Sequence, residues 1–309
     1  MEIVNESRTD EFILLGLSEN PKIQGLLFQL FFLLYVSTVL GNFLLIVAVR
    51  IDSRLHHSMY FFLSNLSFLD ICYTTIIVPK MLVNIALSSK NISFAGCLLQ
   101  VYFYLFMGET ECILLAFMAY DRYVAICHPL HYNVIMNPMS CVRMIIVSWL
   151  VGCTISSFDI YFMYQLRFCG PVAIDHFFCE APSLLQLSCS DISVNNIVTL
   201  VGSSILLIIP VCLILFSYVQ IFVVLVKIGS RKHKAVSTCV SHIAVVIIFY
   251  GTATFMYMKP RYSSTEVTDK LVSVFYTVVT PMLNPLIYSL RNKDVRRALR
   301  QIEKCITVQ

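Results

Sequence analysis

The most informative stretch of the sequence is MAYDRYVAIC, Met118–Cys127. It places an acid and a base, Asp121 and Arg122, at the end of a long apolar run that has the character of a membrane helix. Charged side chains within a membrane are costly and usually functional. Because this pair stands at the boundary, on the side where basic residues accumulate, it indicates a charged group that faces the cytoplasm.

The composition outside this stretch is also that of a membrane protein. Of the 309 residues, 58% are hydrophobic and 13% charged, and the mean hydropathy is +0.79, whereas about a quarter of a soluble domain is charged. A helix needs roughly 20 apolar residues to cross a hydrocarbon core. Seven windows meet that length, without the alternation that a β-barrel needs. The predicted spans are Gly25–Val49, Ser58–Val78, Leu98–Cys127, Met144–Tyr164, Asn195–Val226, Ala235–Met258 and Leu271–Leu290.

Basic residues set the predicted orientation. With the N-terminus outside, most of the 22 Lys and Arg residues fall in cytoplasmic segments. The sequence thus predicts one all-α domain: an extracellular tail (1–24), a seven-helix bundle (25–290) and a cytoplasmic tail (291–309). A short amphipathic helix is expected within that tail, at Asn292–Lys304. The basic inner surface suits anionic lipid and an acidic protein partner rather than nucleic acid.

The predicted outer side carries two kinds of modification signal. The N-terminal residues are acidic and polar, so no cleavable signal peptide is expected, and Asn5 begins a glycosylation sequon. Four cysteines also lie outside, which predicts two disulfides with three connectivities open. They are Cys97, Cys169, Cys179 and Cys189, three of them in one loop that would form a stapled lid.

Five motifs occur in order along the chain, at separations that make the set specific. They are Gly41-Asn42, LHHSMYFFLSNLSFLD (Leu55–Asp70), MAYDRYVAICHPLHY (Met118–Tyr132), KAVSTCVSHIAVV (Lys234–Val246) and PMLNPLIYSLRNKDV (Pro281–Val295). Through them nearly the whole chain resembles a rhodopsin-like (class A) G-protein-coupled receptor and, within that superfamily, a vertebrate olfactory receptor of the tetrapod type (class II). One departure is visible: His57-Ser58 stands where the family commonly has Thr-Pro.

The resemblance implies an odorant receptor of the plasma membrane. Such a receptor binds small volatile molecules and activates a stimulatory, olfactory-type heterotrimeric G protein, which raises cyclic AMP. It implies the disulfides Cys97–Cys179 and Cys169–Cys189. No enzymatic activity and no cofactor are expected, since H-E-x-x-H, G-x-S-x-G and phosphate-loop motifs do not occur.

The resemblance also assigns an activation switch to the cytoplasmic half of the helix bundle. Arg122 is expected to be held by Asp121 in a closed state and released to a partner's carbonyl groups in an open one. The base of the sixth span is basic, so the acid that completes this lock in many relatives is not expected. Pro285 interrupts the hydrogen bonds of the seventh span. The implied switch residues are Asp121, Arg122, Tyr123, Tyr218, Asn284, Pro285 and Tyr288.

The ligand is expected in the outer half of the bundle, beneath the lid. The candidate residues, mapped by motif position, are largely apolar with a few hydroxyls, which suits a small, weakly polar molecule. Tyr104 stands where amine receptors carry aspartate, and Glu109 is the one acid in the set. The candidates are Tyr104, Leu105, Gly108, Glu109, Cys112, Gly202, Ser203, Leu206, Tyr250, Ala253, Thr254, Tyr257 and Thr277.

Few ionisable residues occur within the spans, chiefly Asp70, Glu109, Glu111, Asp159 and His242. The resemblance places Asp70 and Glu111 at a central polar site with two asparagines, Asn42 and Asn284. An unpaired carboxylate there would either bind a cation such as sodium or be protonated. The sequence leaves both alternatives open.

Three other classes of membrane protein fit the sequence less well. A transporter or channel would need broken helices in paired positions or a ring of charge along a pore, and Asp70 and Glu111 alone do not make one. A peptide or amine receptor would need a strong ionic anchor in its pocket. An opsin is excluded because Leu271–Leu290 contains no lysine that could hold retinal.

Overall fold

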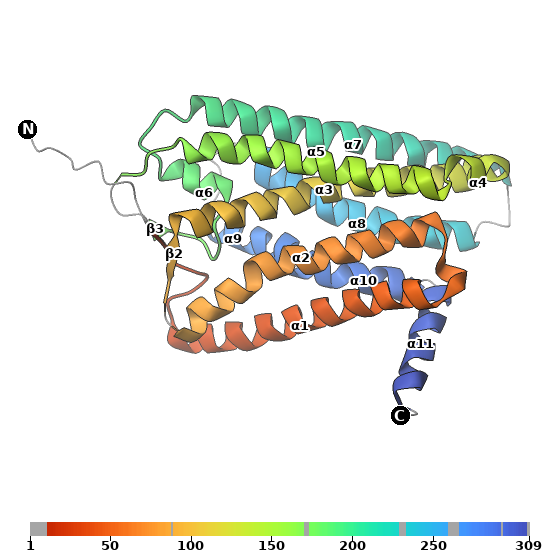
Figure 1. The fold of residues 1–309 in the computed structure, drawn as a ribbon, viewed down its shortest axis with the longest axis horizontal. Helices are drawn as coiled ribbons and strands as arrows, with labels where there is room; N and C mark the ends of the chain where they lie inside the picture. The colour runs from red at the N-terminus through yellow and green to blue at the C-terminus, as the bar shows by residue number, and fades with distance from the viewer. Residues whose placement is uncertain are drawn as a thin grey trace, which may run out of the picture.

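The computed structural model describes residues 11–87, 89–169, 173–228, 233–258, 266–291 and 293–307. Within these ranges, seven helical stretches are long and apolar enough to cross a membrane. They pack side by side in an elongated bundle (Figure 1), which confirms the predicted fold class. The spans are α1 (Pro21–Ile51), α2 (Ser58–Leu87), α3 (Phe94–Cys127), α5 (Pro138–Tyr164), α7 (Ser193–Ile228) and α8 (His233–Met258), with a seventh built from α9 (Glu266–Val274), the π-helix η4 (Phe275–Val279) and α10 (Thr280–Arg291).

Several spans extend beyond their predicted windows because polar caps and prolines set their ends. α1 begins at Pro21 rather than Gly25: the Asn20 side chain accepts a backbone N–H of the first turn, and proline fits that turn. α5 likewise begins at Pro138, and Asn137 caps it. A hydropathy window finds the apolar centre of a span, whereas the caps are polar and fall outside the window.

Short elements gather at the two ends of the bundle (Figure 1). The end with the N-terminus holds a three-stranded sheet in the order β2-β1-β3, in which β1 is antiparallel to β2 and parallel to β3. These strands were not predicted, because a window of membrane length is too long to reveal them. This end contains β1 (Glu11–Leu14), β2 (Asn91–Ser93), β3 (Ala173–Ile174) and α6 (Ala181–Gln186), and the opposite end contains η1 (Ser53–Leu55), η2 (Pro129–His131), α4 (Tyr132–Ile135) and α11 (Lys293–Thr307).

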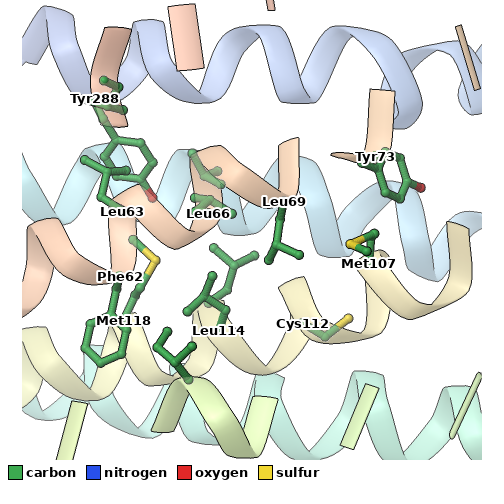
Figure 2. Close-up of a cluster of buried hydrophobic side chains, with 14 of the residues drawn as sticks. Phe62, Leu63, Leu66, Leu69, Tyr73, Met107, Cys112, Leu114, Met118 and Tyr288 are labelled. Carbon is green, nitrogen blue, oxygen red and sulfur yellow. The ribbon is translucent and has the colours of Figure 1, made fainter. Parts of the chain in front are cut away.

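The apolar core lies where α2 and α3 meet the helices around them. Leu66 and Leu69 of α2 and Leu114 of α3 are almost completely buried. Figure 2 shows these side chains gathered between the ribbons, with Tyr288 of α10 in the same cluster. Large apolar side chains on α7, such as Phe216, are instead exposed. That outward face suits a helix surrounded by lipid, since lipid chains are themselves apolar.

Candidate functional site

The loop between α5 and α7 forms a lid over the end of the bundle that holds the three-stranded sheet, termed the outer end, and the end that holds α11 is termed the inner end. The disulfide Cys97–Cys179 ties this loop to the beginning of α3, and Cys169–Cys189 closes a second bridge within it. This is the pairing that the resemblance implied. The backbone N–H of Cys179 also donates to the Gln100 side chain at 2.9 Å. The lid is therefore fixed to α3 by a covalent bond and by a buried hydrogen bond.

Aromatic side chains of the lid pack into the helix bundle. Phe177 and Phe178 are completely or almost completely buried in the main core cluster. The neighbouring His176 is also buried, and the loss of water around its ring lowers its pKa to about 3, so the imidazole is neutral. On the outer side, Lys270 of α9 donates to Asp175 of the lid at 2.5 Å. The lid thus contacts the seventh span as well as α3.

Beneath the lid, a mainly apolar cavity lies between α2, α3, α5, α7, α8 and the seventh span. The Tyr104 hydroxyl donates to the Tyr276 hydroxyl across it at 3.0 Å, which links α3 to η4. The predicted ligand contacts on α3 line the cavity together, and some of those on α7 and α8 join them. The predicted residues in its wall are Tyr104, Leu105, Gly108, Glu109, Cys112, Ser203, Leu206 and Ala253.

Four of the other predicted contacts, all within the described part of the chain, do not line this cavity. Gly202 faces Ile155 of α5, and Thr254 is exposed on the outer face of α8. Tyr250 is buried, where its hydroxyl donates to the Cys112 carbonyl at 2.7 Å. Thr277 is buried within the seventh span and donates to the carbonyl four residues earlier. The side chain of Tyr257 lies outside the part of the chain that the structure describes.

On η4 and α8 the side chains that reach the cavity are one position away from those that were predicted. A π-helical turn carries more residues than an α-turn, so side chains within η4 point in other directions than they would in an α-helix. There Tyr276 lines the cavity, whereas Thr277 bonds within the seventh span. On α8 the lining face is formed by Phe249, Thr252 and Ala253, one position away from the face that was predicted.

Several lining residues were missed altogether. Asp159 of α5 had a usable signal, since an ionisable residue inside a span is functional by default. The aromatic and aliphatic residues had none, because they look like ordinary packing. The missed residues are Tyr73, Asp159, Met163, Ala181, Thr199, Leu207, Phe249, Thr252 and Tyr276.

The inner end of α3 differs from the expected lock. The Asp121 carboxylate accepts hydrogen bonds from the Ser58 hydroxyl at 2.5 Å and from the Tyr132 hydroxyl at 2.9 Å. Among the described residues, no ion pair joins it to Arg122. Burial, together with the nearby Asp121, raises the pKa of Tyr132 to about 12, so this hydroxyl keeps its proton. Two hydroxyl donors hold Asp121 in place of Arg122, and one of them is Ser58, part of the His57-Ser58 pair at which the sequence departs from the resemblance.

The remaining switch candidates lie along the inner half of the bundle. The Tyr218 hydroxyl is 2.6 Å from Nδ1 of His242 and links α7 to α8. Tyr123 bonds to the His128 ring at 3.0 Å. Tyr288 is buried, and its hydroxyl has no hydrogen-bond partner in the described part of the chain. Of these, the Tyr218–His242 contact joins two helices, and the role of these residues in switching stays a prediction.

The central polar residues meet between α2, α3 and α10. The Asn284 amide donates to both oxygens of Asp70, at 3.0 and 3.2 Å, one residue before Pro285. Glu111 is buried nearby, and one of its oxygens has no partner among the described residues. Asn42 bonds to the backbone of α1 and α10. Two buried carboxyl groups near one amide fit either a bound cation or a shared proton.

Seven apolar helices, a disulfide-bonded lid, an outer cavity and a charged inner end define the rhodopsin-like class of receptor fold. The structure is similar to that of squid rhodopsin, with a TM-score of 0.71 over 93% of this chain and 87% of that chain. The sequences are 18% identical, so this likeness shows the fold alone.

The sequence relationships are much closer. The family model for olfactory receptors matches residues 31–304. Human olfactory receptor 2G3 is 49% identical over 304 residues, which cover 98% of each chain. Mouse olfactory receptor 1M1 is 50% identical over 305 residues, which cover 98% of this chain and 97% of that one. The chain belongs to the olfactory receptor family. It is a multi-pass membrane receptor and not an enzyme.

Proposed function

We propose that the chain binds a small volatile molecule in the cavity beneath the lid and, once bound, activates a stimulatory, olfactory-type heterotrimeric G protein that raises cyclic AMP. The observation that carries this proposal is the position of the cavity. It lies at the disulfide-bonded end of the bundle, whereas Arg122 lies near the opposite end. A ligand and an intracellular partner would thus act on opposite ends of the same helices.

Coupling between the two ends would be a shift of population. A ligand that contacts α3, α7 and α8 more closely in one arrangement favours that arrangement. The Tyr218–His242 contact and the Asp70–Asn284 contact join helices along the way. Asp70 and Glu111 would bind a sodium ion in the resting arrangement or share a proton. The receptor would lie in the plasma membrane with its N-terminus outside.

Replacement of Arg122 tests the signalling part of the proposal. Arg122→Gln is expected to abolish odorant-stimulated cyclic AMP while surface expression persists. Arg143→Gln is the matched control, because Arg143 is exposed near the inner end of α5. Normal signalling by Arg122→Gln would contradict the assignment. Ion currents in cells that lack G-protein signalling would instead favour a channel.

A further inference from the structure

Two carboxyl groups line the ligand cavity: Glu109 on α3 and Asp159 on α5. Glu109 and Asp159 are each only 8% exposed. The other lining side chains are apolar or carry a neutral hydroxyl or thiol group. The cavity therefore has acidic character on one side and an apolar wall elsewhere.

Neither acid has a charged partner in the described part of the protein. Lysine, arginine and histidine form no ion pair there with Glu109 or Asp159. One oxygen of Glu109, Oε2, is buried without any hydrogen-bond partner among the described residues. A buried carboxyl oxygen without a donor is destabilising. A ligand that brings donors and positive charge would remove that cost.

A metal ion does not fit this site. The described residues contain no group of three or more histidine, cysteine, aspartate or glutamate side chains that could hold a metal. The cavity wall around the two acids is instead formed by side chains such as Leu105, Leu206 and Phe249. Apolar walls and a pair of acids favour an organic cation with a hydrocarbon body.

We propose that this receptor recognises protonated primary amines, an inference that rests on the proposed function. The ammonium group of the amine lies between the side chains of Glu109 and Asp159. An ammonium group offers three donors, and its hydrogen bonds to carboxylates are charge-assisted. The hydrocarbon part would pack against the apolar wall. Glu109 follows Tyr104 by five residues, so this anchor lies about 7.5 Å deeper along α3 than Tyr104 does. A carboxylic acid ligand would be repelled.

Three ligands with one carbon skeleton test the chemistry: n-hexylamine, n-hexanol and n-hexanoic acid. In cells that express the receptor at their surface, the amine is expected to raise cyclic AMP at a concentration at least about tenfold lower than the alcohol, and the acid is expected to be inactive. An alcohol as potent as the amine would overturn the inference and indicate that the carboxyl groups accept hydrogen bonds from neutral ligands.

Substitution of the two acids tests their roles. Glu109→Gln and Asp159→Asn should each raise the half-maximal concentration of n-hexylamine about tenfold or more, and by a larger factor than that of n-hexanol. Glu19→Gln is the matched control, since Glu19 is an exposed acid near the outer end of α1. Unchanged amine potency in both cavity variants at normal surface expression would overturn the inference.

A binding measurement separates this inference from the proposed function. n-Hexylamine should raise the unfolding temperature of the purified receptor, and Glu109→Gln should remove that shift. If the shift is present but cyclic AMP does not rise, the ligand class holds and the proposed signalling fails. If neutral odorants raise cyclic AMP and n-hexylamine neither binds nor signals, the proposed function holds and the amine inference fails. Absence of the shift in the unaltered receptor also overturns the inference.

Discussion

Asp121 is a buried carboxylate held by two hydroxyl groups at the inner end of α3. Tyr132→Phe removes one donor and keeps the ring, which leaves the carboxylate with fewer hydrogen bonds. A hydrogen bond to a charged group contributes about 1.5–3 kcal/mol. The variant is therefore expected to unfold at a lower temperature in detergent. Tyr161→Phe is the control, because Tyr161 is 59% exposed on α5. Equal unfolding temperatures for the two variants would show that the Tyr132 hydroxyl contributes nothing.

His176 makes the lid sensitive to acid. Its pKa in the folded lid, about 3, lies below the ordinary value of 6.5, chiefly because the ring is buried. The opened lid therefore binds a proton at pH 5 and the closed lid does not. Stability is complete above about pH 6.5 and falls as the pH drops towards 3. Asp175, Asp269 and Lys270 lie around the ring, and Glu180 Oε1 is 3.8 Å from Nε2, but burial outweighs these charges and the pKa stays lowered.

The measurable consequence is a slope of stability against pH. Between pH 6.5 and pH 5 the closed lid should lose about 2 kcal/mol, since one pKa unit corresponds to about 1.4 kcal/mol. Unfolding temperatures across that range should fall less steeply for His176→Gln than for the unaltered receptor. His131→Gln is the control, because His131 is exposed. Identical slopes in all three proteins would exclude His176 as the source.

At the residue scale, the sequence predicted chemistry better than it predicted contacts. Asp121 was recognised as important from its position at a membrane boundary, yet its partners, Ser58 and Tyr132, come from segments that only the fold brings together. Asp159 was visible as an acid within a span, but its place in the cavity depends on how α5 packs beside α3. Hydrogen-bond partners distant in sequence follow from packing, which no local pattern encodes.

At the element scale, Gly152 sets how closely α3 and α5 approach. A Cβ atom there would collide with the Thr110 hydroxyl and lie 3.1 Å from the Phe106 carbonyl oxygen, part of the α3 backbone. Gly152→Ala should therefore push the helices apart, at a cost of about 1–3 kcal/mol. Thermal unfolding of the purified receptor would measure this loss of stability, and we expect a lower midpoint for Gly152→Ala.

Gly251 on α8 provides the matched control. A Cβ atom at Gly251 would meet nothing within 4 Å. Gly251→Ala should be neutral or slightly stabilising, because alanine favours the helix by up to about 1 kcal/mol. If Gly152→Ala unfolded at the same temperature as Gly251→Ala, the close approach of α3 and α5 would not be limiting.

Helices and strands could be predicted where their sequence pattern runs through many consecutive residues. Seven apolar windows located the seven spans, because crossing a membrane requires a long unbroken run. The π-helix η4 was not predicted, since its residues FYTVV are as apolar as their surroundings. The strand β1 was also not predicted, because four residues that pair with distant segments give little local signal. These two elements help to shape the outer end, where the lining of the cavity departs from the predicted contacts.

At the scale of the whole molecule, the two ends of the bundle differ in chemistry. The outer end carries both disulfides and the small sheet that includes the N-terminal strand β1. At the opposite end α11 turns away from the bundle axis (Figure 1). There Val295 is buried and Arg296, Arg297 and Arg300 are exposed, as expected for an amphipathic helix on an anionic membrane surface.

This polarity predicts the topology of the receptor in cells. Disulfides form in oxidising compartments, and basic residues are retained on the cytoplasmic side. An epitope placed before Glu11 should therefore be stained by antibody in intact cells, whereas an epitope after Gln309 should be stained only after permeabilisation. The two tagged receptors control for each other, since both share the same bundle. Staining of the C-terminal epitope in intact cells would show that the orientation is the reverse of the predicted one. The cavity beneath the lid would then lie on the cytoplasmic side, out of direct reach of an external odorant.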